Sequence, residues 1–242
     1  MNLTGRTALV TGASRGIGAA IALALAEAGA DVAVNYRERS AEADSVATAI
    51  VAMGRRAMTV AADVSDGAAV ARMIQQVTDR LGGVDILANN AGIGLIRGID
   101  DLTEADFDRT IAVNLKSVFL CTQAVLPHMH AQAWGRIVNI SSGAARGAGG
   151  VGPHYNASKA GMEGLTRGYA ARLVKQGITV NAVAPSLIET DMVRSGVASS
   201  PARIPLGRFG TSEEVAQIVL MLVGNAYMTG QTVALSGGMA FN

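Results

Sequence analysis

The chain has 242 residues, half of them hydrophobic, and a formal net charge of +1 at pH 7 from 20 basic and 19 acidic side chains. This length and composition can bury a sizeable core within one α/β domain. The balanced charge creates no field that would attract nucleic acid or an anionic membrane. We therefore expect a small molecule as the partner, and neither nucleic acid nor a membrane.

The chain has a single cysteine and no segment that resembles a leader. Cys121 stands alone beside the apolar stretch Val118-Phe119-Leu120, which excludes an intramolecular disulfide and a multi-cysteine metal site. Residues 1–6 lead directly into an apolar run, without the basic and apolar regions of a signal peptide. No uninterrupted apolar run reaches the roughly 18 residues of a membrane-spanning helix. We expect a cytoplasmic protein without a metal site.

Short apolar runs alternate with longer amphipathic ones from end to end, as is typical of βαβ units in a parallel sheet that is covered on both faces. The predicted strands lie at about 7–11, 31–36, 56–61, 84–89, 136–141, 178–184 and 231–235. The predicted helices lie at about 16–29, 40–54, 66–81, 103–131, 154–176 and 211–224. Gly29 and Gly54 stand where the first two helices need C-terminal caps. The pattern predicts an α/β fold with a doubly wound parallel sheet of seven strands, helices on both faces, and a single domain over 1–242.

Two segments interrupt this pattern, the glycine-rich Gly143–Gly152 and the weakly periodic Pro185–Pro205. Both follow predicted strands. Open parallel sheets bind their ligands beyond the carboxyl ends of the strands, so we expect both segments at the site, with a substrate lid at about 186–205.

The first predicted strand ends in a glycine-rich turn, Thr11-Gly12-Ala13-Ser14-Arg15-Gly16-Ile17-Gly18. Glycines allow a tight turn and a close approach of the backbone to a pyrophosphate, which would face the N-terminus of the next helix. The spacing G-x-x-x-G-x-G differs from the usual G-x-G-x-x-G. The strand before it and the helix after it nevertheless favour a dinucleotide site over an ordinary connection, with contacts from Gly12, Ser14, Arg15, Gly16, Ile17 and Gly18.

The charges after the second strand distinguish two cofactors. An acid about 20 residues beyond the glycine turn would bind the ribose hydroxyl of NAD, whereas an arginine accommodates the 2′-phosphate of NADP. Here the strand ends in Val34-Asn35-Tyr36-Arg37, with no acid before Glu38, and Arg15 offers a second cation. We predict NADP, with NADPH preferred. If Arg37 is only solvated and Glu38 holds a hydroxyl, NAD or dual use follows instead.

Four segments together resemble the short-chain dehydrogenase/reductase family. They are the glycine turn, Asn89-Asn90-Ala91-Gly92, Ser142 with Tyr155-Asn156-Ala157-Ser158-Lys159, and Pro185 with Thr190. The resemblance implies a Rossmann fold and hydride transfer between NADP(H) and a carbonyl or secondary alcohol. It also implies further cofactor contacts, from Asn35, Tyr36, Arg37, Asp63, Val64, Asn90, Ala91, Gly92, Tyr155, Lys159, Pro185, Ile188 and Thr190. For Asp63 a role in the turn before the next helix is the alternative.

Ketone reduction needs a proton on the developing alkoxide, and Tyr155 is the predicted donor. A free phenol has a pKa of about 10, and a nearby cation lowers it. Lys159 lies four residues further on and therefore on the same helix face. Ser142 can orient the substrate oxygen by a hydrogen bond; preferring it to Ser141 rests on the family's spacing of thirteen residues before the tyrosine. Asn114 resembles the family's fourth catalytic residue, which supports a proton relay.

Each of these residues has a plainer interpretation. Tyr155 and Lys159 would be a pair on a helix surface, and Ser142 would end a strand or cap a helix. Asn114 would be a buried amide that satisfies backbone groups. A non-catalytic dinucleotide-binding sensor is the corresponding alternative function, and loss of a catalytic position would be its mark.

Within the family, the chain is most similar to 3-oxoacyl-[acyl-carrier-protein] reductases, through Gly177-Ile178-Thr179-Val180-Asn181 and Gly237-Gly238-Met239. The resemblance implies reduction of a 3-oxoacyl thioester or a related ketone. Ala133 and Gln176 stand where those reductases have basic residues for an acidic carrier, so delivery by a carrier protein stays open. An NAD-dependent alcohol or sugar dehydrogenase is the alternative enzyme.

The helices at 103–131 and 154–176 resemble those that pair across subunits in this family, which implies a homotetramer. The histidines carry no clear site. His128 and His130 are two residues apart and diverge on a helix, so we interpret them as surface residues. His154 either lines the pocket or lies on the surface at a helix start.

Overall fold

The computed structural model describes residues 1–191, 193 and 200–240. In these residues seven parallel strands form one sheet in the order β3-β2-β1-β4-β5-β6-β7. The strands are β1 (Thr7–Val10), β2 (Asp31–Tyr36), β3 (Ala57–Ala61), β4 (Ile86–Asn89), β5 (Gly135–Ile140), β6 (Ile178–Pro185) and β7 (Thr232–Leu235). The chain reverses its direction across the sheet between β1 and β4, which is where open parallel sheets bind ligands.

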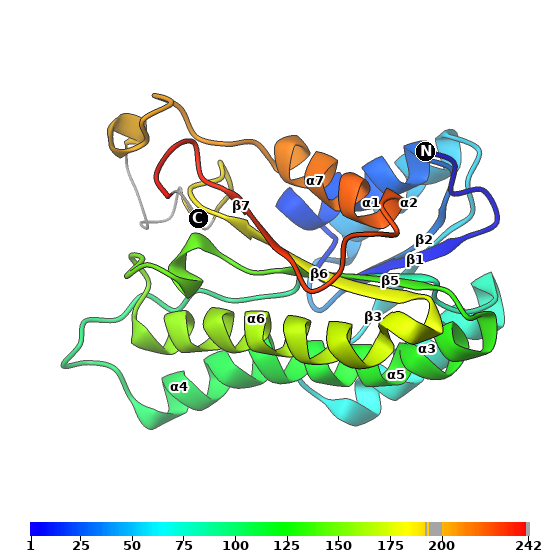
Figure 1. Cartoon of the computed structure of the whole chain (residues 1–242), viewed down its shortest axis with the longest axis horizontal. Helices are drawn as coiled ribbons and strands as arrows, with labels where there is room; N and C mark the ends of the chain where they lie inside the picture. Colours follow the sequence, from blue (N-terminus) through cyan, green and yellow to red (C-terminus); the bar gives the residue numbers. More distant parts are fainter. Residues whose placement is uncertain (192, 194–199, 241–242) are drawn as a thin grey trace.

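Helices cover both faces of the sheet (Figure 1). One layer consists of α1 (Gly16–Glu27), α2 (Ser40–Ala52) and α7 (Ser212–Gly224). The other consists of α3 (Gly67–Leu81), α4 (Glu104–Ile111), α5 (Ser117–Gln132) and α6 (Pro153–Leu173). The predicted doubly wound α/β fold is therefore confirmed.

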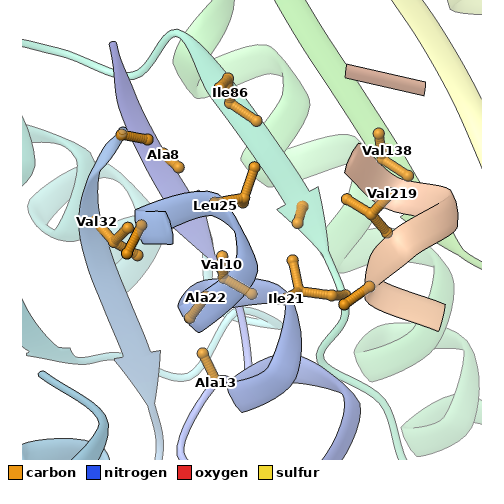
Figure 2. Close-up of a cluster of buried hydrophobic side chains, with 14 of the residues drawn as sticks. Ala8, Val10, Ala13, Ile21, Ala22, Leu25, Val32, Ile86, Val138 and Val219 are labelled. Carbon is orange, nitrogen blue, oxygen red and sulfur yellow. The ribbon is translucent and has the colours of Figure 1, made fainter. Parts of the chain in front are cut away.

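Alternate residues of the central strands pack into two separate cores. In β1, Ala8 and Val10 face α1 and α7, where they join Leu25 and Val219 (Figure 2). Leu9 points the other way, into the core beneath α3, α5 and α6. The central strands β1, β4, β5 and β6 are buried along their whole length and have no solvent face, so they appear in the sequence as largely apolar runs.

The predicted helix at 103–131 is interrupted by a π-helical turn. It begins after Thr103, whose side chain forms a capping box with Asp106, but a π-helical turn, η1 (Ala112–Lys116), separates α4 from α5. A π-turn accommodates one extra residue and changes the direction of the side chains within it. Here it contains Asn114, which is completely buried.

The run Glu104–Gln132 is also, among the described residues, the one helix that is long and apolar enough to cross a membrane by length and composition. Of its most apolar stretch, 44% is buried within the structure. The buried side packs against α3, α6 and the sheet. A core helix meets the same criterion, so this finding does not indicate a membrane span.

Several predicted boundaries shift by a few residues for local reasons. Asp66 is the N-cap of α3, where its carboxylate accepts a hydrogen bond of 2.8 Å from the Ala68 N–H. α6 ends at Leu173 and is followed by a 3₁₀ turn, η3 (Val174–Gln176). Gly29 and Gly54 follow α1 and α2 with φ angles of 106° and 77°, which confirms them as terminating residues.

Candidate functional site

A cleft of about 510 Å³ lies beyond the carboxyl ends of the central strands, within the roughly 300–1,000 Å³ of small-molecule and cofactor sites. It brings together nearly all the predicted cofactor residues from six separate segments. Those on its wall are Gly12, Ser14, Arg15, Gly16, Ile17, Gly18, Asn35, Arg37, Asp63, Val64, Asn90, Ala91, Gly92, Tyr155, Lys159, Pro185, Ile188 and Thr190. Of the predicted lid at 186–205, residues 192 and 194–199 lie outside the described residues.

Tyr36 is the predicted cofactor residue that the structure does not bring to the cleft. Its half-buried side chain packs against the core beneath α1 and α2. Successive side chains of a strand point to opposite faces, so Tyr36 cannot share the direction of Asn35 and Arg37.

The glycine turn is built for close backbone contact. Gly12 has a φ of 61°, and a Cβ there would lie 2.9 Å from Ala91 Cα. A Cβ on Gly18 would overlap the Gly12 carbonyl oxygen and the Asn90 amide, and would lie 2.9 Å from Ala13 Cα. These positions require glycine because the next segments occupy the space that a side chain would need.

Two asparagines hold the turn in place. Asn35 accepts a hydrogen bond of 3.2 Å from the Gly12 N–H and donates one of 3.2 Å to the Val60 carbonyl. Asn90 donates to the carbonyls of Thr11 and Gly12 at 2.9 and 3.0 Å. Both amides thus bond the backbone of the turn, and their contribution to a ligand site is to fix its shape.

The N-terminus of α1 has properties suited to an anion. Its N-cap residue, Arg15, makes no side-chain cap, whereas Asp66, Thr103 and Thr211 cap α3, α4 and α7. The first N–H groups of a helix have no partner within the helix, and they carry partial positive charge. On α1 these groups lie at the cleft, with Gly16 in its wall. A pyrophosphate fits this arrangement.

Among the described residues, three arginines line the cleft, and each is paired with a carboxylate. Arg15 pairs with Asp191, beyond β6. Arg37 pairs with Glu38 and, at 4.0 Å, with Asp63. Arg39 pairs with Glu42 at 3.0 Å. The arginine side chains are between 41% and 50% exposed, so a phosphate could replace a carboxylate as their partner.

Asp63 serves the turn as well as the cleft. Its carboxylate accepts hydrogen bonds from the Ser65 N–H and hydroxyl, at 2.9 and 2.6 Å. Burial raises the pKa of Asp63, but the bonds from Ser65 and the charge of Arg37 outweigh it and hold that pKa below its usual value. Both sequence interpretations of Asp63 are therefore compatible with its position.

Three of the predicted catalytic side chains converge on the cleft. Tyr155 and Lys159 lie one turn apart on α6, and the Lys159 Nζ is 5.7 Å from the centre of the Tyr155 ring. Ser142 follows β5 and hydrogen-bonds the Tyr155 side chain. The hydroxyl of Ser141 instead lies 3.3 Å from the Lys159 carbonyl and 3.3 Å from Glu163. The geometry therefore favours Ser142 over Ser141 as the hydroxyl beside the phenol.

The pKa of Tyr155 differs from the sequence expectation. Burial raises it, and the hydrogen bond with Ser142 opposes this shift only in part. Burial also lowers the pKa of Lys159 to about 8, and its ammonium donates a hydrogen bond of 2.8 Å to the Ile140 carbonyl. The expected lowering of the Tyr155 pKa by Lys159 is absent here because desolvation acts on both groups and disfavours their charged forms.

Asn114 lies behind the cleft wall. Its side chain accepts a hydrogen bond of 2.8 Å from the Ile93 N–H and donates one of 3.0 Å to the Ile93 carbonyl. It also donates to the Ser158 hydroxyl at 3.2 Å. In this structure Asn114 satisfies backbone groups and joins the loop after β4 to α6, while a role in a proton relay stays a prediction.

Sequence reasoning missed an ion pair near the catalytic groups, between the buried Glu163 and the exposed Arg146. Glu163 is 4% exposed and accepts a hydrogen bond of 3.0 Å from Arg146 Nε, in the glycine-rich segment. Glu163 lies one helical turn beyond Lys159, so the spacing Tyr155, Lys159, Glu163 was visible in the sequence. The cleft wall also contains residues that were not predicted, Arg39, Ala62, Ile93, Val113 and Ile140. It further contains Glu38 and Ser141, which were only alternatives, and Ser186, Glu189, Asp191 and Val193 from the predicted lid.

Two of the three histidines differ from their surface interpretation. His128 is half-buried, with its Nε2 3.4 Å from an Asp85 oxygen. His154 is only 1% exposed, so its surface interpretation is wrong. His130 is exposed. Across the described part of the chain, no three His, Cys, Asp or Glu side chains come together as metal ligands.

The lowered pKa of Lys159 predicts a stability effect. Below pH 8 the folded protein contains Lys159 as a buried cation, whereas in the unfolded chain the pKa of Lys159 has its ordinary value of 10.5. Lys159→Met should therefore raise the free energy of unfolding at pH 7, by about 1–2 kcal/mol after loss of the bond to Ile140. Between pH 8 and 10.5 the unfolded state binds more protons, so wild-type stability rises and the difference shrinks. Urea unfolding of both proteins at pH 7 and pH 10 measures this, and a less stable variant at pH 7 would contradict it.

The fold and the cleft together are those of a dinucleotide-dependent enzyme. The family model for short chain dehydrogenases matches residues 6–200. The chain belongs to the short-chain dehydrogenase/reductase family. It is accordingly an oxidoreductase that acts on CH–OH groups.

Relatives with defined activities cover almost the whole chain. A 3-oxoacyl-[acyl-carrier-protein] reductase of Synechocystis sp. is 44% identical over 241 residues, which cover 98% of each chain. A subunit of (2S)-[(R)-hydroxy(phenyl)methyl]succinyl-CoA dehydrogenase from Thauera aromatica is 41% identical over 98% of each chain. The solved structure of a gluconate 5-dehydrogenase from Burkholderia cenocepacia, in complex with NADP and tartrate, is 35% identical with a TM-score of 0.91, over 98% of this chain and 96% of that one.

Proposed function

We propose that the protein reduces the ketone of a 3-oxoacyl thioester, or of a related carbonyl compound, to a secondary alcohol with NADPH. The observation that carries this proposal is the convergence of Ser142, Tyr155 and Lys159 on the same cleft that the glycine turn lines. The presence of all three side chains argues against a non-catalytic sensor.

In the reducing direction Tyr155 donates the phenolic proton to the oxygen of the ketone. The bound nicotinamide dinucleotide supplies the hydride to the carbon. Ser142 holds the oxygen beside the phenol by a hydrogen bond. The Lys159 ammonium attracts the negative charge that develops on the phenol as the proton leaves, although in the resting site burial keeps the pKa of Tyr155 raised. Because burial raises the pKa of Tyr155, the resting side chain is protonated and ready to donate. Asn114 joins the loop after β4 to α6 through its hydrogen bonds to Ile93 and Ser158. By family resemblance it also supports the return of a proton from solvent to Tyr155.

The cofactor residues support NADP over NAD. Arg15, Arg37 and Arg39 line the end of the cleft beyond β2, and no acid precedes Glu38 there. The gluconate 5-dehydrogenase structure contains NADP. The specific observation in favour of NAD is Glu38, which lines the cleft while it pairs with Arg37.

Arg37→Gln is expected to weaken NADPH binding by roughly 10- to 100-fold, since a charged hydrogen bond contributes about 1.5–3 kcal/mol, and to leave NADH binding nearly unchanged. Fluorescence titration with each nucleotide measures both constants. Arg72→Gln, on the exposed side of α3, is the matched control and should change neither. Tighter binding of NADH than of NADPH by the wild type would establish the NAD-dependent alternative.

The substrate proposal rests on the relatives and on an apolar patch. Two relatives act, by name, on an acyl-carrier-protein thioester and a CoA thioester. Beside the catalytic phenol, Ala144, Val151 and Tyr155 form a small buried apolar cluster. NADPH consumption should be measured with a 3-oxoacyl-CoA, with the same acyl group on carrier protein, and with an oxidised sugar acid. Turnover of the sugar acid alone would exclude the thioester.

We propose a homotetramer, as in the family. Phe107 on α4 and Phe119 on α5 are 44% and 45% exposed, and paired helices would cover such side chains. Light scattering tests this, and a monomer would contradict it.

We also propose a cytoplasmic location. The only cysteine, Cys121, is buried, and burial raises the pKa of its thiol to about 12, as suits a protein that needs no oxidising compartment. Cell fractionation tests this.

A further inference from the structure

His154 precedes the predicted proton donor on α6 and is almost fully buried, with 1% of its surface exposed. Its Nε2 lies 2.9 Å from the Leu95 carbonyl oxygen, in the loop between β4 and α4. On its other side, the ring lies so close to Gly152 that a Cβ there would be 2.8 Å from His154 Cε1. The imidazole therefore packs between the loop after β4 and the glycine-rich segment before α6.

The hydrogen-bond partner determines the tautomer of this ring. A carbonyl oxygen only accepts, so His154 Nε2 must carry the proton and donate it to Leu95. In the described structure the Nδ1 atom is buried and has no partner. An unpartnered polar atom in the interior lowers the stability of the fold by about 1–3 kcal/mol. The ring is buried in spite of this cost, so its single hydrogen bond, from Nε2 to Leu95, is the interaction to which we assign a role.

The loop after β4 is thus held by buried side chains at two points. Asn114 bonds both backbone groups of Ile93, at 2.8 and 3.0 Å, and His154 bonds the carbonyl of Leu95. Ile93 and Tyr155 both line the cleft. His154 lies on α6 itself, and Asn114 on η1 also donates a hydrogen bond to Ser158 of α6. The two anchors therefore tie this wall of the cleft to the helix that carries the phenol.

We propose that His154 is a positioning residue, which fixes the loop 93–98 against α6 and thereby sets the shape of the substrate side of the cleft. The expected effect on KM rests on the proposed function, whereas the expected effect on the loop itself does not. A rigid wall next to the reacting carbonyl holds the substrate in place. Loosening the wall should therefore affect substrate binding more than cofactor binding, because the glycine turn and Arg37, which are the predicted pyrophosphate and 2′-phosphate contacts, lie on other segments.

Two substitutions of His154 separate the hydrogen bond from the packing. His154→Gln retains an N–H that can reach the Leu95 carbonyl, whereas His154→Phe fills a similar volume without a donor. We expect His154→Phe to raise the KM for the ketone about tenfold, the size of one neutral hydrogen bond, with kcat and the Kd for NADPH little changed. His154→Gln should stay close to the wild type. His130→Phe, on an exposed histidine of α5, is the control and should change nothing.

A second measurement needs no activity. In the protein without substrate, amide hydrogen exchange of peptides that cover 93–98 should be faster in His154→Phe than in the wild type or His154→Gln. Equal exchange in all three proteins, or equal KM values for the Phe and Gln variants, would overturn the inference. If the wild type reduces no ketone, the proposed function fails, and the exchange comparison alone decides whether His154 holds the loop.

Discussion

Replacing Tyr155 with phenylalanine is expected to lower kcat for ketone reduction by about 100- to 10,000-fold, the usual contribution of a positioned general acid. The variant keeps the aromatic ring, which is 8% exposed and packs with Ala144 and Val151. It loses only the hydroxyl that bonds Ser142. Packing and the glycine turn are untouched, so the Kd for NADPH should stay within about threefold, or 0.7 kcal/mol.

The same helix offers a matched control. Tyr169 lies near the other end of α6, and its hydroxyl accepts a hydrogen bond of 2.9 Å from Gln123 rather than facing the cleft. Tyr169→Phe should retain wild-type kcat and KM. Steady-state kinetics and a nucleotide titration of both variants are sufficient. Unchanged turnover in Tyr155→Phe would remove the phenol from the mechanism.

Gly18→Ala is expected to weaken NADPH binding by about 100-fold, because a shift of about 1 Å in a binding element has effects of this size. Its methyl group would overlap the Gly12 carbonyl and the Asn90 amide, and would approach Ala13 Cα. The turn and the loop after β4 cannot shift independently to make room for the methyl group. Asn90 joins them by hydrogen bonds of 2.9 and 3.0 Å to the carbonyls of Thr11 and Gly12. Overpacking of this kind also lowers the free energy of unfolding by about 1–3 kcal/mol.

Gly164→Ala is the control for this substitution. Gly164 lies on the exposed side of α6, and a Cβ there has no atom within 4 Å. Alanine should stabilise the helix by about 0.5–1 kcal/mol and leave NADPH binding unchanged. Urea unfolding and nucleotide titration of both variants test the pair. Wild-type affinity in Gly18→Ala would show that the turn does not hold the cofactor as proposed.

The fold was largely predictable because its signals are local. Strands buried on both faces appear as short apolar runs, and every predicted strand is present in the sheet. The π-turn at Ala112–Lys116 was not predicted, because one extra residue hardly disturbs a helical pattern of apolar positions. Its consequence is large, since it buries Asn114 against Ile93.

The site was predictable where a motif fixes the backbone, and less so where distant residues meet. The glycine turn and the spacing of Ser142, Tyr155 and Lys159 identified most of the cleft wall. Tyr36 stays a prediction that the cleft wall does not include, because strand alternation directs its side chain away from Asn35 and toward the core.

Pairings between distant segments and the effects of burial had no sequence signal. The ion pair of Arg15 with Asp191 joins residues that are far apart in the chain, and its existence depends on how the segment after β6 lies over the turn. The raised pKa of Tyr155 depends on how deeply α6 buries the phenol. The burial of His154 likewise depends on the loop after β4, which the sequence does not place.

Isotope transfer tests the central claim most directly. NADPH carrying deuterium at both C4 positions should be incubated with the wild type and a 3-oxoacyl-CoA, and the product examined by mass spectrometry. We predict a 3-hydroxyacyl thioester with one deuterium on the carbinol carbon, and no labelled product with Tyr155→Phe on the same time scale. An unlabelled alcohol, or no alcohol from any ketone offered, would contradict an NADPH-dependent ketone reductase.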